Sequence, residues 1–277
     1  MTHSRPHIHD LLDRHGLAAR REFGQNFVAD PNTVRRIAEL SRVGPGDLVI
    51  EIGPGLGSLT LALIETGATV VAIEIDSGLA DVAAEIVGDT ATVIEADALK
   101  LDWDSLIAEH FDPDLGGGIH VVSNLPYNVG TTLVLDILAG VGEVATLTVL
   151  VQAEVADRFA ASPGSKVYGI PSVMAALHST SEVVASVPPS VFVPKPKVDS
   201  SVIRFERRKG APEVSHDELA RVVKAAFGQR RKMIRRSLSG ILSEEEIVAA
   251  GVDATLRAEQ LGLDQWIDLA RALDSNG

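Results

Sequence analysis

The alternation of short apolar runs with longer amphipathic stretches between residues 48 and 152 is the feature that most limits how this chain can fold. The apolar runs have the length and the Val/Ile content of buried strands. The stretches between them have the length and spacing of amphipathic helices. Because strands that alternate with helices form a parallel sheet covered on both faces, we predict an α/β fold. The predicted strands are 48–53, 70–76, 92–97, 120–124 and 145–152, and the helices lie near 58–66, 77–87, 131–138 and 153–161.

Two further strands are predicted at one edge of this sheet, over 182–187 and 201–206, which gives seven strands in all. The proline-rich segment 188–197 between them predicts a stiff, extended loop. Composition changes after residue 207, where a linker at 208–214 precedes stretches of helical spacing. These predicted helices are 216–228, 230–240, 243–250, with Ser243 and Glu246 as a capping box, and 264–273. We therefore predict a polar, irregular extension over 1–30, an α/β domain over 31–207 and a small all-helical domain over 208–277.

Composition excludes several classes of protein. No apolar run approaches the roughly 20 residues of a membrane helix, and the N-terminus lacks the apolar centre of a signal peptide. The chain has no cysteine, which excludes disulfides and thiolate metal sites and fits the cytoplasm. His7 and His9 superficially suggest a metal pair, but they lack further ligands, so we predict a solvated tail and no metal. Trp103 and Trp266 are interpreted as packing residues.

Charge is unevenly distributed along the chain, although the net charge of −13 argues mildly against a nucleic-acid partner. Residues 1–203 carry 12 basic and 26 acidic side chains, whereas residues 204–236 carry 11 basic and 4 acidic ones. The second region is thus a basic block on an acidic protein, typical either of a nucleic-acid contact or of a solvated helix face.

A glycine-rich turn follows the first predicted strand, in the sequence Glu51-Ile52-Gly53-Pro54-Gly55-Leu56-Gly57. Such a turn lets a ligand approach the backbone closely, in the crevice beyond the carboxyl ends of parallel strands. Glu74 and Asp97 end the next two strands, where their carboxylates could accept ribose hydroxyls and an adenine amino group. A dinucleotide site would show Gly-x-Gly-x-x-Gly. The shorter spacing here favours a cofactor without phosphates, S-adenosylmethionine.

The sequence Asn124-Leu125-Pro126-Tyr127 ends the fourth predicted strand. An adenine amine is a poor nucleophile, and the Asn124 amide oxygen with the Leu125 or Pro126 carbonyl can accept its two N–H groups and localise its lone pair. Tyrosine supplies a flat face on which a flipped-out base can stack. A strand that simply ends in a turn is the alternative. We predict that these four residues are catalytic.

The chain resembles the ribosomal RNA adenine N6,N6-dimethyltransferases, specifically the bacterial small-subunit (16S) enzymes, nearly from end to end. The similarity lies in the segments already described and in three others: Gly24-Gln25-Asn26-Phe27, the segment from Phe192 to Ser200, and the segment from Ala226 to Lys232. The resemblance implies a class I methyltransferase with a Rossmann-like, mostly parallel seven-stranded sheet and a helical C-terminal domain that binds RNA and the ribosome. It implies dimethylation of two adjacent adenosines in the 3′-terminal hairpin loop of 16S rRNA, and maturation of the 30S subunit. Loss of methylation would alter kasugamycin sensitivity.

The resemblance also implies site residues. Those expected at the cofactor are Gln25, Asn26, Val28, Glu51, Gly53, Gly55, Gly57, Glu74, Ile75, Asp97, Ala98 and Asn124. Those expected at RNA are Phe192, as a stacking ring, and Lys195, Lys197, Arg230, Arg231, Lys232 and Arg235. Val28 stands where leucine is usual, and the chain is more acidic than most relatives. We expect a monomer that meets 16S rRNA in the immature 30S subunit, with no membrane partner. A DNA adenine methyltransferase and a non-catalytic assembly factor are the alternatives.

Overall fold

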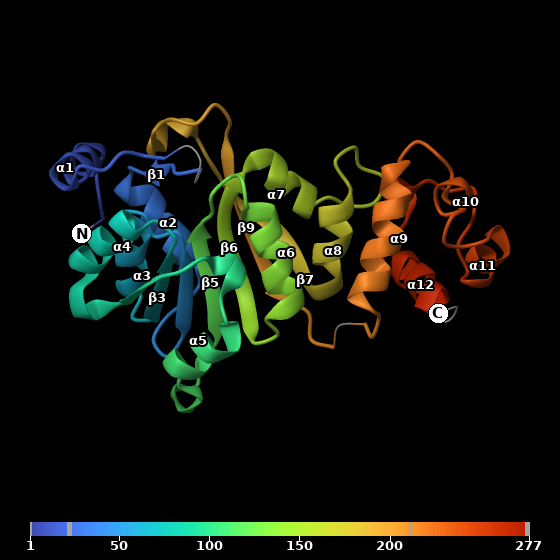
Figure 1. The fold of residues 1–277 in the computed structure, drawn as a ribbon, viewed down its shortest axis with the longest axis horizontal. Coiled ribbons are helices and arrows are strands. Elements are labelled where there is room, and N and C mark those ends of the chain that lie inside the picture. Colours follow the sequence, from blue (N-terminus) through green and yellow to red (C-terminus); the bar gives the residue numbers. More distant parts are fainter. Residues whose placement is uncertain (1, 21–23, 211, 275–277) are drawn as a thin grey trace. The chain divides into compact units, whose positions relative to one another are not determined.

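The structure is a computed structural model that describes residues 2–20, 24–210 and 212–274. It divides into two compact units, which we describe separately. The first unit comprises Met1–Ala156 and Glu182–Glu206, and the second comprises Asp157–Ser181 and Arg207–Gly277. Figure 1 labels the elements along the chain. The strands are β1 (Phe27–Val28), β2 (Leu48–Ile52), β3 (Thr69–Glu74), β4 (Thr92–Glu95), β5 (Ile119–Asn124), β6 (Val144–Gln152), β7 (Ser179–Val187), β8 (Phe192–Val193) and β9 (Ser200–Arg207).

The α-helices of the first unit begin near the N-terminus and recur between the strands. They are α1 (Arg5–His15), α2 (Pro31–Ser41), α3 (Ser58–Ile64), α4 (Ser77–Val87), α5 (Trp103–His110) and α6 (Gly130–Gly140). Helix α7 (Ala153–Phe159) crosses from the first unit into the second. The remaining helices belong to the second unit: α8 (Ile170–His178), α9 (His216–Gly228), α10 (Ile234–Ser237), α11 (Glu244–Ala249) and α12 (Leu263–Asp274).

Seven strands form one sheet in the order β4-β3-β2-β5-β6-β9-β7 (Figure 1). The strands from β4 to β6 pair in parallel, and β9 pairs antiparallel with β6. The α/β prediction is therefore confirmed, and every predicted strand is present. The strand order reverses between β2 and β5, and ligands of parallel α/β sheets bind in the crevice at such a point.

The interior strands are buried on both faces, as their continuous apolar sequences predict. Every residue of β2 is buried. One face packs Val49, Val70 and Val122 against α2 and α3, which contribute Ile37 and Leu63 to the same core cluster. This packing fixes the carboxyl ends of β2, β3 and β5 relative to each other, and the candidate site lies at those ends.

The prediction of an irregular N-terminal extension is wrong, because Arg5–His15 form the helix α1. Its signals are Pro6 in the first turn, Gly16 at the C-cap with φ of 64°, and apolar residues at helical spacing. The apolar residues Ile8, Leu11 and Leu12 are buried against β1, α4 and the glycine-rich turn. The segment is thus packed through its apolar side chains, whereas His7 and His9 themselves are exposed, as predicted. Most of the segment is polar, which made its apolar stripe hard to recognise.

The second unit has the predicted helical character, with two differences from the predicted boundaries. The capping box of α11 is confirmed, since Glu246 N donates to Ser243 Oγ and Ser243 N donates to Glu246 Oε2. The predicted helix 230–240 shortens to α10, because residues 229–232 form turns. Residues 157–181, predicted to be part of the α/β domain, belong to the second unit. Tyr168 shows why, since its hydroxyl donates to the carbonyl of Leu261 at 2.9 Å.

Candidate active site

The first unit contains a pocket of about 270 Å³ at the carboxyl ends of β2, β3, β4 and β5. The segment from Gly24 to Val28 forms another part of its wall, and Ile8 of α1 reaches it as well. Fifteen positions were predicted for the cofactor or for catalysis, and Gly57 alone does not line the pocket. The others are Gln25, Asn26, Val28, Glu51, Gly53, Gly55, Glu74, Ile75, Asp97, Ala98, Asn124, Leu125, Pro126 and Tyr127.

The glycine-rich turn approaches the pocket with its backbone. Gly53 and Gly55 have φ of 72° and 57°, a region that favours glycine. A Cβ atom on Gly55 would lie 2.9 Å from the ring of Phe27, so this position also needs the absence of a side chain. Gly57 has a different role, because it is the N-cap of α3 with φ of 74°.

Glu74 ties this turn to the end of β3. Its Oε2 accepts a hydrogen bond from Gly55 N at 3.0 Å, and its Oε1 accepts one from Asp76 N at 3.0 Å. Burial raises the pKa of the Glu74 carboxyl, although the two backbone donors oppose the shift. Each carboxylate oxygen has a further acceptor site, so the group can still bind ligand hydroxyls.

Glu51 is a second buried carboxyl, at the end of β2. Its side chain is only 1% exposed, and burial raises its pKa to about 8, with a smaller contribution from the negative charge of Glu74. Its Oε2 has no hydrogen-bond partner among the described residues. A buried acceptor that lacks a partner and lines a pocket is suited to a cationic or hydrogen-donating ligand group.

Asp97 also lines the pocket, just beyond the end of β4. Its carboxylate contacts Lys100 Nζ at 3.0 Å and accepts from Leu99 N at 3.1 Å, and the Lys100 hydrogen bond contributes most to lowering the pKa of Asp97. Two large apolar side chains that line the same pocket are unusually exposed. Ile75 is 49% exposed and Leu99 is 46% exposed. Leu99 was not predicted. An apolar residue two positions after a strand-end carboxylate was the only signal for it.

The amide of Asn124 is held by the N-terminal wall of the pocket. Asn124 Nδ2 donates to the carbonyl of Asn26 at 2.9 Å, and Asn26 Nδ2 donates to the carbonyl of Gly24 at 3.0 Å. Because the nitrogen of the Asn124 amide is engaged, its oxygen remains as an acceptor. Gln25 anchors the same wall, since its Nε2 donates to Asp76 Oδ2 at 3.3 Å.

The two carbonyls that follow Asn124 differ in availability. Pro126 O accepts from Val129 N at 3.3 Å and from Gly130 N at 3.0 Å, where α6 begins. No hydrogen bond to Leu125 O is found in the described part of the chain. The sequence left these two carbonyls as equal candidates to hold an amine, and the structure favours Leu125.

Tyr127 is half-buried, and its hydroxyl lies 2.6 Å from Ser200 Oγ. Burial raises the pKa of the Tyr127 phenol, and the Ser200 hydrogen bond opposes this in part. The sequence marks Ser200 only as the end of a family signature and predicts no role for it. The contact joins residues far apart in sequence, so spacing could not have revealed it.

The residues predicted to bind RNA fall into both units. In the first unit, Lys195 and Lys197 are exposed in the loop before β9, whereas Phe192 has no exposed surface and packs in the core cluster with Val28. A fully buried ring cannot stack on a base, so the structure does not support the role predicted for Phe192.

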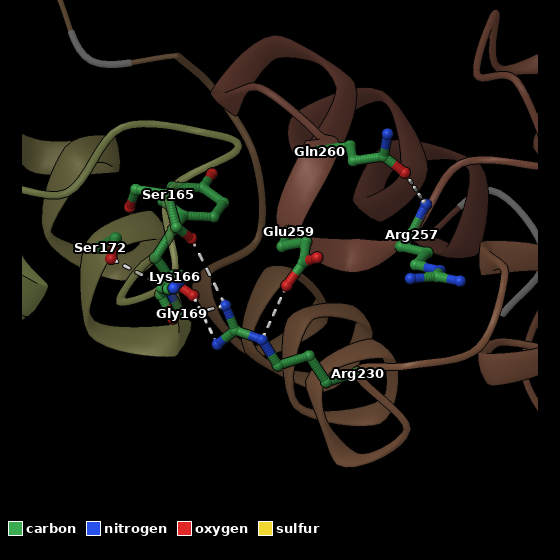
Figure 2. Close-up of polar contacts among 9 residues, drawn as sticks. Ser165, Lys166, Gly169, Ser172, Arg230, Arg257, Glu259 and Gln260 are labelled. Atoms are coloured by element: carbon green, nitrogen blue, oxygen red, sulfur yellow. Dashed lines mark hydrogen bonds and ion pairs between the residues drawn. The ribbon is translucent and has the colours of Figure 1, made fainter.

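In the second unit, Arg230 is an internal contact of that unit (Figure 2). Its Nε donates to Glu259 Oε2 at 2.9 Å, and its terminal nitrogens donate to the carbonyls of Tyr168 and Lys166 at 2.9 and 2.8 Å. Arg235 is also paired, with Glu244 at 2.9 Å. Arg231 and Lys232 are exposed and have no ion-pair partner in the described ranges.

Two other kinds of feature are absent from the described ranges. No group of three or more His, Cys, Asp or Glu side chains there could hold a metal ion. No helix there is both long enough and apolar enough to cross a membrane.

The comparisons with known proteins agree with the geometry of the pocket. The family described as Ribosomal RNA adenine dimethylase matches residues 16–275. A Phenylobacterium zucineum protein named Ribosomal RNA small subunit methyltransferase A is 45% identical over 271 residues, with 96% of this chain and 92% of that protein covered. A Cutibacterium acnes protein of the same name is 44% identical over 282 residues, with 97% and 92% covered. Among solved structures, the 23S rRNA methyltransferase ErmE has a TM-score of 0.66 and 27% identity, with 90% of this chain and 99% of that chain covered. This chain therefore belongs to the ribosomal RNA adenine dimethylase family.

Proposed function

We propose that this chain uses S-adenosylmethionine to dimethylate N6 of two adjacent adenosines in the 3′-terminal hairpin loop of 16S rRNA. Membership of the dimethylase family supports the reaction, and relatives named for the small ribosomal subunit support the choice of RNA. The observation that carries the proposal is the Asn124 amide, anchored through its nitrogen in the same pocket as the glycine-rich turn and Glu74.

The pocket fits this cofactor, which supplies a methyl group on a positively charged sulfur. Glu74 has acceptor sites left for ribose hydroxyls, and Asp97 has one for an adenine amino group. Ile75 and Leu99 offer apolar surface for the adenine ring. Glu51 has an unpartnered oxygen for the cationic end of the molecule, because a buried carboxyl gains from a positive neighbour.

The acceptor side of the pocket orients the amine of the target adenosine. Asn124 Oδ1 and the Leu125 carbonyl accept its two N–H groups, which draws the nitrogen towards tetrahedral geometry and localises its lone pair. The ring of Tyr127 stacks on the flipped base. Because the methyl donor is already activated, positioning of the two reactants supplies most of the rate enhancement.

No strong base is required of the protein. Methylation makes the adenosine nitrogen acidic, so its proton leaves to solvent. The Tyr127 hydroxyl is not suited to accept it, because burial raises the pKa of this phenol and its oxygen is engaged with Ser200. A monomethylated amine still has one N–H and a lone pair, so a single acceptor can orient it for the second transfer.

The identity of the RNA substrate and of the particle that contains it follows from the relatives rather than from the pocket. We propose that the substrate is 16S rRNA within the immature 30S subunit, met in the cytoplasm by a monomer whose exposed lysines and arginines contact phosphates. Methylation would accompany maturation of the subunit, and its loss would alter sensitivity to kasugamycin.

The test is to incubate the protein with labelled cofactor and undermethylated small subunits, and then to identify the modified nucleoside by mass spectrometry. We expect dimethyladenosine as the main product. Asn124→Ala should abolish both transfers, because the amine loses an acceptor, while cofactor affinity should change far less than the rate. Stable monomethyladenosine from the wild-type protein would contradict the proposed acceptor geometry.

Two alternative functions give different results in the same assay. A DNA adenine methyltransferase would label DNA in preference to small subunits. A non-catalytic assembly factor would bind immature subunits but transfer no methyl group. The intact set of pocket residues favours catalysis over binding alone.

A further inference from the structure

The ring of Tyr127 is anchored at its far end. Its hydroxyl lies 2.6 Å from Ser200 Oγ, within the range of a strong O–H···O hydrogen bond. The backbone of Tyr127 is at the other end of the side chain, directly after Pro126. A restraint at both ends limits lateral movement of the ring, and because a phenol O–H prefers the plane of its ring, the contact also favours one direction of the ring face.

Ser200 is itself held firmly. It is the first residue of β9, has no exposed surface and pairs with Gln152 at the end of β6. The preceding carbonyl, of Asp199, accepts from Ala153 N at 3.0 Å. The hydroxyl that meets Tyr127 thus comes from rigid sheet rather than from the exposed loop before it.

The same strands position Asn124. It ends β5 and pairs with Leu150 of β6, two residues before Gln152. Asn124 is therefore fixed on one side of β6 and Ser200 on the other. The hydrogen bond between the Tyr127 and Ser200 hydroxyls closes this arrangement, because it links the turn after β5 to the start of β9.

We propose that Ser200 is a positioning residue, which holds the Tyr127 ring so that the target adenine stacks with its amine at Asn124. This role rests on the proposed function, because it assigns Ser200 to the acceptor side of that reaction. Ser200 touches neither cofactor nor base and acts only through Tyr127.

A hydroxyl pair that only stabilises the fold would behave differently. Its loss would lower the melting temperature and would affect cofactor binding and methyl transfer alike. Loss of a positioning contact would slow methyl transfer on bound RNA while cofactor affinity stays near the wild-type value.

The experiment compares three variants: Ser200→Ala, Tyr127→Phe and the double variant that carries both substitutions. Ser201→Ala is the separate control. Ser201 is the next residue of β9, is also buried, and points to the opposite face of the strand. Single-turnover methyl transfer is measured on saturating undermethylated small subunits, and cofactor affinity is measured by calorimetry.

We expect Ser200→Ala to slow methyl transfer by about three- to tenfold, the effect of an ordinary hydrogen bond. Cofactor affinity should stay within about twofold, and the Ser201→Ala control should match the wild type in both. Tyr127→Phe keeps the ring and removes the hydroxyl, so it should reproduce the loss. The double variant should be no slower than either single one, because both remove the same contact.

A spectroscopic measurement gives an answer that does not depend on activity. The chain has two tyrosines, so fluorotyrosine labelling yields two fluorine resonances, and Tyr127→Phe identifies that of Tyr127. Ser200→Ala should shift or broaden this resonance, and Ser201→Ala should not. Equal effects of Ser200→Ala in the wild-type and Tyr127→Phe backgrounds would overturn the inference. If the wild-type protein methylates no RNA, the proposed function fails instead.

Discussion

Glu51 shows how much the meaning of one carboxyl depends on its surroundings. The sequence places it at a strand end, typical of a charged ligand contact, but the structure buries it completely beside Glu74. Burial without a compensating cation favours the protonated form. The carboxyl of Glu51, with a pKa of about 8, is therefore largely neutral near pH 7.

This burial predicts a dependence of stability on pH. Between about pH 4.5 and 8 the unfolded chain ionises Glu51 while the folded protein keeps its proton, so the free energy of unfolding falls as pH rises. Each unit of pKa difference corresponds to about 1.4 kcal/mol. Glu51→Gln keeps the shape of the side chain but does not titrate. The melting temperature of this variant should therefore rise relative to that of the wild type as pH rises. Thermal unfolding from pH 5 to 9 is the check, and a constant difference would count against a neutral Glu51. Glu74→Gln should change the pH dependence in the same direction, since the pKa of Glu74 is raised as well.

The Arg230 and Arg231 pair shows why the sequence could not separate structural from exposed cations. Both lie in one basic run, and both were predicted to contact RNA. Their roles differ because Glu259 and the carbonyls of the 165–168 segment happen to meet only Arg230. Partners contributed by distant segments cannot be read from spacing. For the same reason, the role of Ser200 could not be predicted, although the family signature that contains it was recognised.

At the scale of elements, the sequence predicted the strands and the functional residues at their ends, but it did not predict the N-terminal helix α1. Parallel strands have continuous apolar sequences, and their carboxyl ends lie at the same edge of the sheet. Glu74, Asp97 and Asn124 were therefore expected to lie close together. Helix α1 buries only three apolar side chains in a largely polar segment. Burial against the glycine-rich turn, rather than the composition of the segment, stabilises it.

The glycine-rich turn allows a matched pair of substitutions. Gly55→Ala and Gly57→Ala both place a side chain at positive φ, which costs about 1–2 kcal/mol. The new Cβ at position 55 would also press on Phe27 at 2.9 Å, whereas at position 57 the nearest atom is an ordinary 3.7 Å away. Because Phe27 adjoins Asn26, which anchors Asn124, we expect Gly55→Ala to weaken cofactor binding at least about tenfold more than Gly57→Ala. Calorimetric titration with the cofactor decides this, and equal losses would refute a role for the contact with Phe27.

At the scale of the whole molecule, a net charge of −13 must be reconciled with an RNA substrate. The reconciliation is local, because some exposed cations without ion-pair partners within the described ranges lie next to one another in the sequence. Arg231 and Lys232 are two of them, and Lys195 and Lys197 lie in the loop before β9.

Salt dependence separates the structural cation from the exposed ones. Each phosphate contact contributes about 0.7–0.9 to the slope of log affinity against log salt. Charge reversal at Arg231 and Lys232 should flatten that slope for binding to undermethylated small subunits, with the melting temperature unchanged. Arg230→Ala should lower the melting temperature, because Glu259 and several carbonyls lose their donor, and should leave the slope near the wild-type value. A slope flattened by Arg230→Ala alone would reverse these assignments.

The two-stranded sheet of β1 and β8 also sets an order of events during translation. Phe27 pairs with Val193, and Val28 pairs with Phe192, so the segment that anchors Asn124 is held by one strand, β8, that is synthesised much later. A nascent chain that has emerged only as far as β6 already has the strands around Glu51, Glu74 and Asn124, but not the partner of its own N-terminal wall. The growing polypeptide thus acquires a complete pocket only when Val193 has left the ribosome, after the parallel half of the sheet is able to fold.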